Sequence, residues 1–489
     1  MSWSDQLWSK AKQTGNETLT LLDSGYNQAQ RRLEMASNRR VCIGITGLSK
    51  SGKTSFITSL INQLLCFDKA NLSGFSPFVD DRIISVKQLP LEGKLFPAFP
   101  YDEFYQTVAS AEPAWPIPTK AMSGCLLEIR MRHHEKSVNP FRGDTFTLKL
   151  EIRDYPGEWL LDLPMLDLSY RAWCMQSLAQ YSDEPRKQLM GDLLTDLQQL
   201  DPFAKADLAT IEELNGRYKV FLKRCKSHGN TLGFIQPGRF LIPGAVENAL
   251  QLCFIPLLML GQCNEEDLKR AAPDSYYKVN LDRYNEYINA LVRPFFHDFF
   301  SDIDRQLVLV DVIQALYGGP DAINDLREAM NRISKCFAYG KSGVLDRLFA
   351  PKVDRVIYAA TKIDQVTADD HESVRQLLAS VVRKSLQDIK HQGVATKIEA
   401  TSAVRSSKQL VYQGYHAVEG LDLTGKPLRY INPTIPDRIP ESDAEWEPLV
   451  CFSSPVLRPA AGLSYLNQDA FPHIRMDSVL DDLIGDKCQ

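Results

Sequence analysis

The sequence predicts an α/β fold built on a doubly wound, mostly parallel sheet that is interrupted by a large helical insertion. Three observations predict this fold. A glycine-rich loop stands between a short apolar run, 41–46, and a segment in which apolar residues recur at helical spacing. Further apolar runs at 305–313, 355–360 and 396–403 alternate with helix-patterned segments. A long helix-rich block, 159–304, separates these later runs from the first.

The glycine-rich loop reads Gly47-Leu-Ser-Lys-Ser-Gly-Lys-Thr54 and matches the G-x-x-x-x-G-K-[ST] pattern of phosphate-binding loops. Its backbone N–H groups and the following helix N-terminus should attract phosphate. We expect Lys53 to reach the β- and γ-phosphates and Thr54 to place its hydroxyl on Mg²⁺. The predicted nucleotide-binding residues of this segment are Gly47, Leu48, Ser49, Lys50, Ser51, Gly52, Lys53, Thr54 and Ser55.

A predicted hairpin leads to the second motif. Residues 125–132 and 146–153 alternate apolar and polar side chains, which is typical of paired antiparallel strands. Asp154-Tyr-Pro-Gly157 follows directly, and an aspartate there can hold Mg²⁺ while the glycine N–H contacts the γ-phosphate. Glu158 takes the position of the glutamine that orients the attacking water in many small GTPases. It is a candidate base or water-holding group, and a plain surface glutamate is the equal alternative.

A third motif, Thr361-Lys-Ile-Asp364, follows a predicted strand and should face the ligand crevice. Asp364 can accept hydrogen bonds from N1–H and the 2-amino group of guanine, and adenine has no N1 donor, so the motif favours GTP over ATP. The stem of Lys362 can lie over the base. Thr361 replaces the usual asparagine and should keep only part of its role. Ser402 and Ala403 end the next strand and fit the loop that contacts guanine O6.

Two further candidate site residues stand outside the fixed spacing of the three motifs or at a variable position within them. Thr119 is the best candidate for the switch threonine that contacts Mg²⁺ and the γ-phosphate, with Thr107 as the alternative, and capping a turn is an equal interpretation for Thr119. Lys50 is a candidate catalytic residue whose ammonium could supply the charge that an arginine finger brings. A solvated loop lysine is the simpler interpretation of Lys50.

The chain of 489 residues divides into segments of different character. A proline-rich stretch, 68–120, should be irregular or lid-like with short helices at most, and 412–431 could form a hairpin. The N-terminal helical segment should dock on the domain, or else touch a membrane surface or partner. The expected division is an N-terminal helical segment 1–38, a nucleotide-binding domain in two parts 39–158 and 305–440, a helical insertion 159–304 and a C-terminal extension 441–489.

Composition excludes several classes of protein. The net charge of −5 gives no sign of the basic stripe that nucleic-acid binding needs, so no nucleic-acid partner is expected. Ten scattered cysteines without a C-x-x-C spacing fit a reducing cytosol rather than a zinc or redox framework. The most apolar stretch, 249–260, is too short to cross a bilayer, so we expect a kinked buried helix and no transmembrane segment.

The ordered motifs resemble the Ras-like, translation-factor class of P-loop GTPases, which predicts a P-loop NTPase fold of the Ras-like G domain type. More narrowly, the motifs at 47–54, 153–158 and 361–364, with the long insertion, resemble the bacterial YcjX-like family over nearly the whole chain. This resemblance implies a stress-associated cytoplasmic GTPase working beside a membrane-protein partner, and so a peripheral position at the inner membrane is an alternative location.

The motifs therefore predict Mg²⁺-dependent binding of GTP and slow hydrolysis to GDP by in-line attack of water. The γ-phosphate would order the segments 68–120 and 157–165, and the insertion would transmit that change to a protein effector. Two alternatives stay open: an ATP-using P-loop NTPase, and a sensor that holds GTP with little or no turnover. Dimerisation through the nucleotide face also stays open.

Overall fold

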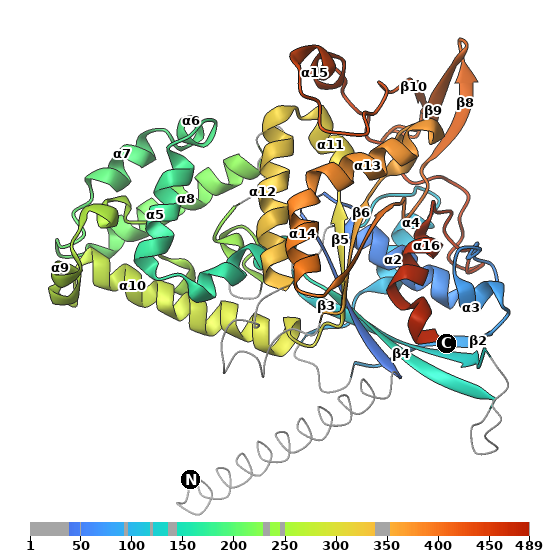
Figure 1. Cartoon of the computed structure of the whole chain (residues 1–489), viewed down its shortest axis with the longest axis horizontal. Helices are drawn as coiled ribbons and strands as arrows, with labels where there is room; N and C mark the ends of the chain where they lie inside the picture. The colour runs from blue at the N-terminus through green and yellow to red at the C-terminus, as the bar shows by residue number, and fades with distance from the viewer. Residues whose placement is uncertain are drawn as a thin grey trace, which may run out of the picture.

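The computed structural model describes residues 39–48, 50–91, 96–117, 121–134, 144–227, 235–244, 250–337 and 353–488. A seven-stranded sheet with flanking helices lies on one side of the molecule, and a helical block extends from it (Figure 1). The predicted α/β fold with a mostly parallel sheet is confirmed. The strands, in chain order, are β1 (Arg40–Gly47), β2 (Ile83–Leu89), β3 (Ser123–Arg132), β4 (Thr145–Asp154), β5 (Arg305–Val310), β6 (Arg355–Ala360) and β7 (Ala395–Ala400).

The strand order is β2-β3-β4-β1-β5-β6-β7. Strands β4, β1, β5, β6 and β7 run parallel to one another. Strand β3 is antiparallel to β4 along its whole length, from Ser123 opposite Asp154 to Arg132 opposite Thr145, which confirms the predicted hairpin. Because five neighbouring strands are parallel, their carboxyl ends meet at one edge of the sheet, where loops can build a ligand crevice.

The stretch 68–120 is more regular than its composition indicates. It contains α3 (Ser76–Val79), strand β2 and α4 (Tyr101–Val108), so the expectation of an irregular segment with short helices at most is wrong. Strand β2 pairs antiparallel with β3, and Pro90 follows it directly. Prolines lack a backbone N–H donor, so they often mark the end of a strand. Prolines near a segment therefore do not rule out a strand there. The many prolines of the stretch led to an expectation of irregular structure, although strand β2 itself contains no proline.

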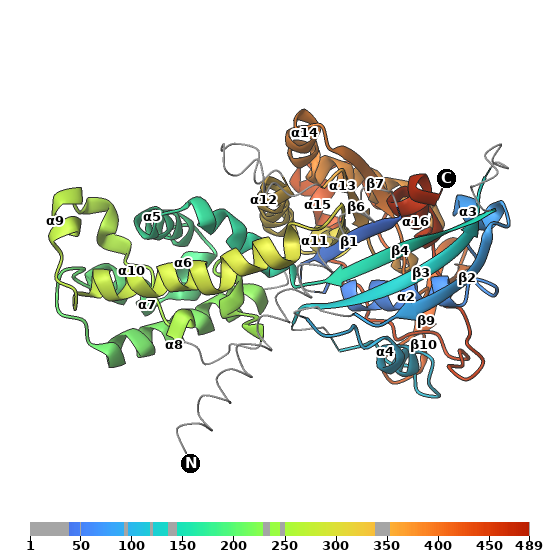
Figure 2. The ribbon, with the colours of Figure 1, turned by 90° about the horizontal axis from the view of Figure 1, so that it is seen from below.

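Helices cover both faces of the sheet. Helices α2 (Lys53–Leu65), α4 and α16 (Met476–Ile484) share one buried apolar cluster with alternate residues of β1 and β5. The opposite face packs against four other helices, and Figure 2 shows α12 to α14 across the strands from α2 and α4. These helices are α11 (Val312–Tyr317), α12 (Pro320–Phe337), α13 (His371–Val381) and α14 (Arg383–His391).

The helical block lies between β4 and β5 in the chain. Its apolar core is continuous with the cluster under α11 to α14, so the insertion shares a core with one face of the sheet. Helix α10 runs on through π-helical turns at Ile288–Val292 and Phe295–Phe300 towards β5. The helices are α5 (Tyr170–Tyr181), α6 (Arg186–Met190), α7 (Asp192–Gln199), α8 (Leu208–Ser227), α9 (Glu265–Arg270) and α10 (Tyr276–Tyr287).

One expectation about the insertion is wrong. The apolar stretch 249–260 was expected to be a kinked helix, but its described part holds short 3-10 turns at Leu250–Leu252 and Leu258–Gln262 with non-helical backbone between them. Pro256 lies in that non-helical part and lacks the N–H that a helix needs. Among the described residues, none of the helices is long and apolar enough to cross a membrane.

A second, three-stranded sheet follows β7. Strands β8 (Ser407–Tyr412), β9 (Tyr415–Leu421) and β10 (Pro427–Tyr430) pair in the order β10-β9-β8. The β9–β10 pairing confirms the predicted hairpin near residues 424–425, and β8 adds a strand that the sequence analysis left out. Helix α15 (Asp443–Val450) comes next, and the predicted N-terminal helical segment 1–38 lies outside the described residues.

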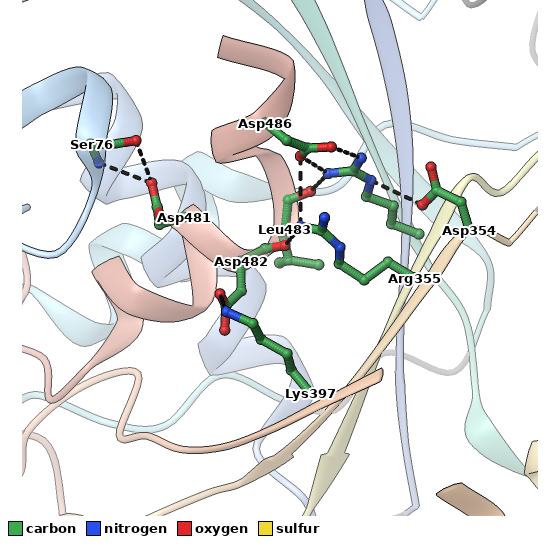
Figure 3. A network of polar contacts seen from close by, with 9 residues as sticks. Ser76, Asp354, Arg355, Lys397, Asp481, Asp482, Leu483 and Asp486 are labelled. Atoms are coloured by element: carbon green, nitrogen blue, oxygen red, sulfur yellow. Dashed lines mark hydrogen bonds and ion pairs between the residues drawn. The ribbon is translucent and has the colours of Figure 1, made fainter. Parts of the chain in front are cut away.

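The segment of α16 and the residues just after it is bound near the starts of three neighbouring strands, β5, β6 and β7 (Figure 3). Arg305, which opens β5, forms an ion pair with Asp486 just after the helix. Arg355, which opens β6, donates to the backbone carbonyl of Asp482, and Lys397 of β7 contacts the Asp482 carboxylate. Arg305 is only 1% exposed, so this ion pair is part of the sheet's packing. The chain end supports the sheet edge opposite the nucleotide motifs.

Candidate functional site

The glycine-rich loop joins β1 to α2 at the carboxyl edge of the sheet. The Ser51 N–H donates to the Leu48 carbonyl at 3.1 Å, and the Phe56 N–H donates to the Gly52 carbonyl at 2.9 Å. Gly52 caps α2 with a left-handed φ of 81°, which favours glycine. It has no side chain to satisfy the first N–H groups of the helix, so this positive helix end is left for an anion. Of the predicted loop residues, Ser49 lies outside the described part of the chain.

Two glycines allow the second motif to touch the loop. A Cβ added to Gly157 would lie 2.5 Å from the carbonyl oxygen of Gly47. A Cβ added to Gly47 would lie 2.7 Å from the carbonyl oxygen of Leu309 on β5. Both distances are shorter than real Cβ contacts, so neither position accepts a side chain without movement. The turn after Asp154 is therefore packed directly against the start of the phosphate-binding loop.

The oxygen ligands expected for Mg²⁺ lie beside this contact. Asp154 is fully buried, its Oδ1 contacts the ammonium of Lys53, and its Oδ2 accepts from the Ser123 hydroxyl at 3.4 Å. Thr54 follows Lys53 in the first turn of α2 and is buried. In the described residues no group of three or more His, Cys, Asp or Glu could hold a metal. One carboxylate and one hydroxyl suit Mg²⁺ only if phosphate oxygens and water complete its shell.

The structure describes only one of the two candidates for the switch threonine. Thr119 lies outside the described residues. Thr107 is in α4, where its hydroxyl donates at 2.8 Å to the carbonyl of Glu103 one turn earlier. This is the ordinary back-bond of a helical threonine and needs no ligand. Lys50 has a left-handed φ of 69° in the loop, and its side chain is exposed.

Glu158 is not a surface residue. It opens a 3-10 helix (Gly157–Asp167) and is 5% exposed, so its interpretation as a plain surface glutamate is wrong. Its carboxylate accepts from the ammonium of Lys226, at the end of α8, at 3.0 Å. A Cβ added to Gly238 would lie 2.0 Å from the Glu158 carbonyl oxygen. The residue after the Asp154 motif is thus held by two segments of the helical insertion.

Lys362 connects the third motif to the phosphate-binding loop. Its backbone is left-handed (φ 61°), and its Cε lies 4.0 Å from where a Cβ of Gly52 would stand. Its ammonium forms a 2.6 Å ion pair with Asp311, just after β5. Asp311 also caps α11 by accepting from the Gln314 N–H at 3.1 Å. Asp311 stands late in its strand, where the sequence allows a contact with the site or, as the favoured interpretation, packing against a helix N-terminus, and the structure shows both contacts.

Asp364 is 3% exposed, and both of its carboxylate oxygens are hydrogen-bonded. Oδ1 accepts from the Ser402 hydroxyl at 2.6 Å. Oδ2 accepts from the Ser406 N–H at 2.8 Å and from the Ser406 hydroxyl at 2.7 Å. The Ser407 hydroxyl donates to the Asp364 carbonyl. Ser406 and Ser407 lie just beyond the predicted residues Ser402 and Ala403, and the signal for them in the sequence is the serine-rich run 402–407.

The loop after β7 is fixed from two sides. The Ser402 N–H and carbonyl pair with Ile474 at 3.0 and 2.9 Å, and the Ala403 carbonyl accepts from the Ser59 hydroxyl of α2 at 2.6 Å. Thr361 is buried, and its N–H donates to the Val310 carbonyl at 3.0 Å. The three motifs therefore converge on one edge of the sheet, and the C-terminal segment helps to hold the last of them.

A titratable group lies beside this loop. His371 begins α13, and burial lowers its pKa below the usual value, against a hydrogen bond with the Ile363 backbone that raises it. Low pKa keeps the imidazole neutral near pH 7, so it adds no charge next to Asp364. Lys362, Asp311 and Asp364 are charged groups at the base end of the site, and Arg475 and Asp370 add charge beside His371.

Comparison with known proteins agrees with this arrangement. Residues 41–488 match the YcjX-like family, DUF463. A protein of Escherichia coli (strain K12) described as "Ras-like GTPase YcjX" is 34% identical over 468 residues, covering 94% of this chain and 98% of the relative. A protein of Shewanella oneidensis with the same description is 33% identical over 485 residues, covering 94% and 97%. The chain belongs to the YcjX-like family.

Proposed function

We propose that this protein is a Mg²⁺-dependent GTPase that works as a molecular switch. The observation that carries the proposal is the convergence of the phosphate-binding loop, Asp154 and Asp364 at the carboxyl edge of one parallel sheet. The direct contact of Lys53 with Asp154 supports it, because a lysine and a metal-binding carboxylate must be neighbours to serve one phosphate group. The descriptions of the two relatives as Ras-like GTPases support it independently.

In this proposal the phosphates lie at the N-terminus of α2. The loop amides and Lys53 hold the negative charge of the β- and γ-phosphates, so Lys53 exchanges Asp154 for phosphate. Thr54 and Asp154 would hold the metal, which would supply positive charge against the phosphates. The Gly157 N–H contacts the γ-phosphate, and water attacks in line to give GDP and phosphate. Thr119 and Lys50 stay candidates for further contacts.

The base is selected by Asp364 in this proposal, with Lys362 over the ring and the loop of Ser402 and Ala403 at guanine O6. The test is competition between GTP and ATP with Asp364→Asn. A lost bidentate contact of this kind removes about 1–3 kcal/mol of discrimination. We therefore expect the preference of GTP over ATP to fall by about five- to 150-fold. A variant that keeps the wild-type preference would falsify the guanine assignment, and melting curves control for folding.

A sensor that binds GTP with little turnover is the second candidate. The Glu158–Lys226 ion pair favours it, because a carboxylate bound to an ammonium at 3.0 Å is a poor base for the attacking water. Phosphate release at saturating GTP and Mg²⁺ separates the two candidates. We expect slow release that stops when the metal is chelated. An ATP-using NTPase, the third candidate, predicts equal competition by ATP.

Wider roles are part of the proposal. We propose that residues 39–158 and 305–440 form the nucleotide-binding unit and that the insertion, 159–304, carries the signal to a protein effector. The Glu158–Lys226 contact supports this route, since it joins the γ-phosphate turn to α8. A cytoplasmic, stress-associated role beside a membrane-protein partner follows from the family resemblance. Affinity purification in GTP-locked and GDP-bound states, read by mass spectrometry, tests for the effector.

A further inference from the structure

The acceptor capacity of the Asp364 carboxylate is nearly used up within the chain. An ionised carboxylate offers about four lone-pair sites, two on each oxygen. Ser402 occupies one site on Oδ1, and the N–H and hydroxyl of Ser406 occupy both sites on Oδ2. Oδ1 therefore keeps one site open, whereas Oδ2 keeps none.

Guanine needs more acceptor sites than the Asp364 carboxylate has open. Recognition of its N1–H and 2-amino groups places one donor on each carboxylate oxygen. The guanine donor that reaches Oδ2 would be a third donor there. Buried donors that lose their acceptor destabilise a complex, so one of the donors on Oδ2 has to give way before guanine is held by both contacts.

The Ser406 hydroxyl is the donor that can leave. The Ser406 N–H is held in the backbone, because the preceding N–H, of Arg405, donates to the Pro472 carbonyl at 2.6 Å and the Ser407 hydroxyl binds the Asp364 carbonyl. The hydroxyl turns about one side-chain bond without moving the backbone. Ser406 is 6% exposed, so its hydroxyl finds little water when it turns and the exchange has a cost.

We propose that Ser406 is a specificity-determining residue whose hydroxyl competes with guanine for Oδ2 of Asp364. The inference rests on the proposed binding of guanine nucleotides at this site. Its consequence is that the wild-type protein binds guanine less tightly than its motif allows. Inosine has N1–H but no 2-amino group, so it needs one acceptor and can use the open site on Oδ1. Removal of the Ser406 hydroxyl should therefore help guanine more than inosine.

The experiment measures dissociation constants of GDP, IDP and ADP for the full chain with Mg²⁺, because diphosphates avoid turnover. Ser406→Ala should bind GDP about three- to tenfold more tightly, a change within the strength of one hydrogen bond to a charged group, and should bind IDP as the wild type does. Ser407→Ala is the matched control, since it removes a neighbouring hydroxyl that does not touch the carboxylate, and it should show no gain. Melting temperatures check that the variants fold, and Ser406→Cys, with a weakly donating thiol, replaces the alanine variant if that one does not fold.

The outcomes separate this inference from the proposed function. Tighter GDP binding by Ser406→Ala with unchanged IDP binding supports the inference. Unchanged or weaker GDP binding, or an equal gain for GDP and IDP, overturns the inference about Ser406 but does not contradict the proposal that the protein binds GTP. A wild-type protein that does not prefer GDP to ADP refutes the guanine assignment itself, and the inference with it.

Discussion

At the scale of single residues, Asp311 has two roles that one substitution can separate. Its carboxylate caps α11 and also pairs with Lys362 at 2.6 Å. Asp311→Asn keeps a good capping side chain but loses the charge that holds the ammonium. We expect GDP affinity to fall about two- to fivefold, the strength of a partly exposed ion pair, with the melting temperature little changed. Unaltered affinity would show that Lys362 needs no support from Asp311.

The residues that carry the chemistry were predictable to the extent that they stand in contiguous motifs. Lys53, Asp154 and Asp364 each follow a strand within a short pattern, and the structure brings these patterns to one edge. Ser406 was not predicted as a site residue, and for Asp311 a structural role was favoured over a contact with the site, because both roles depend on pairing with residues about forty to fifty positions away in the chain. The local pattern marks such residues as polar groups near a strand end, but which residue each one pairs with follows only from the packed fold.

At the scale of elements, the sequence predicted every strand of the large sheet except β2, and it missed β8 of the small sheet. Strand β2 was not recognised because prolines flank it, although none lies within it. Strand β8 was not recognised because its residues are mostly exposed and of mixed composition. Within the predicted helix-rich block, residues 186–199 are divided at Gly191, which has a φ of 56°, into α6 and α7. Periodicity therefore located the helical regions, while breaks and edge strands depended on tertiary contacts.

Helix α16 offers a test of stability at this scale. Burial alone would raise the pKa of Asp486, but hydrogen bonds from the Arg305 guanidinium, together with the positive charges of Arg305, Arg355 and Lys487, outweigh burial and lower the pKa. The lowered pKa stabilises the fold above the ordinary carboxyl pKa, and this contribution is lost as the pH falls through the lowered value. Asp486→Asn should reduce the free energy of unfolding at pH 7 by about 1 kcal/mol, because solvent screens the partly exposed Asp486 and Arg305 keeps Asp354 as a second partner.

Urea unfolding of the wild type and Asp486→Asn measures this difference as a function of pH. The gap between the two proteins should close at acid pH, where the wild-type carboxyl is also neutral. Asp481→Asn is a matched control on the same helix, since Asp481 binds Ser76 instead of a buried guanidinium. A gap that stays constant with pH would mean that the charge of Asp486 does not support the helix.

At the scale of the whole molecule, the proposed switch depends on one connection between nucleotide turn and insertion. Lys226→Ala should keep nucleotide affinity but remove the difference in hydrogen exchange of α8 between GTP-analogue and GDP states, because Glu158 then loses its ion pair with this helix. Lys223→Ala, at an exposed position on α8, should keep that difference. Persistence of the difference in Lys226→Ala would show that the signal takes another route, such as the close packing of Gly238 on the Glu158 backbone. That route is backbone contact and would survive loss of the lysine, so the two variants decide between an ion pair and packing as the coupling element.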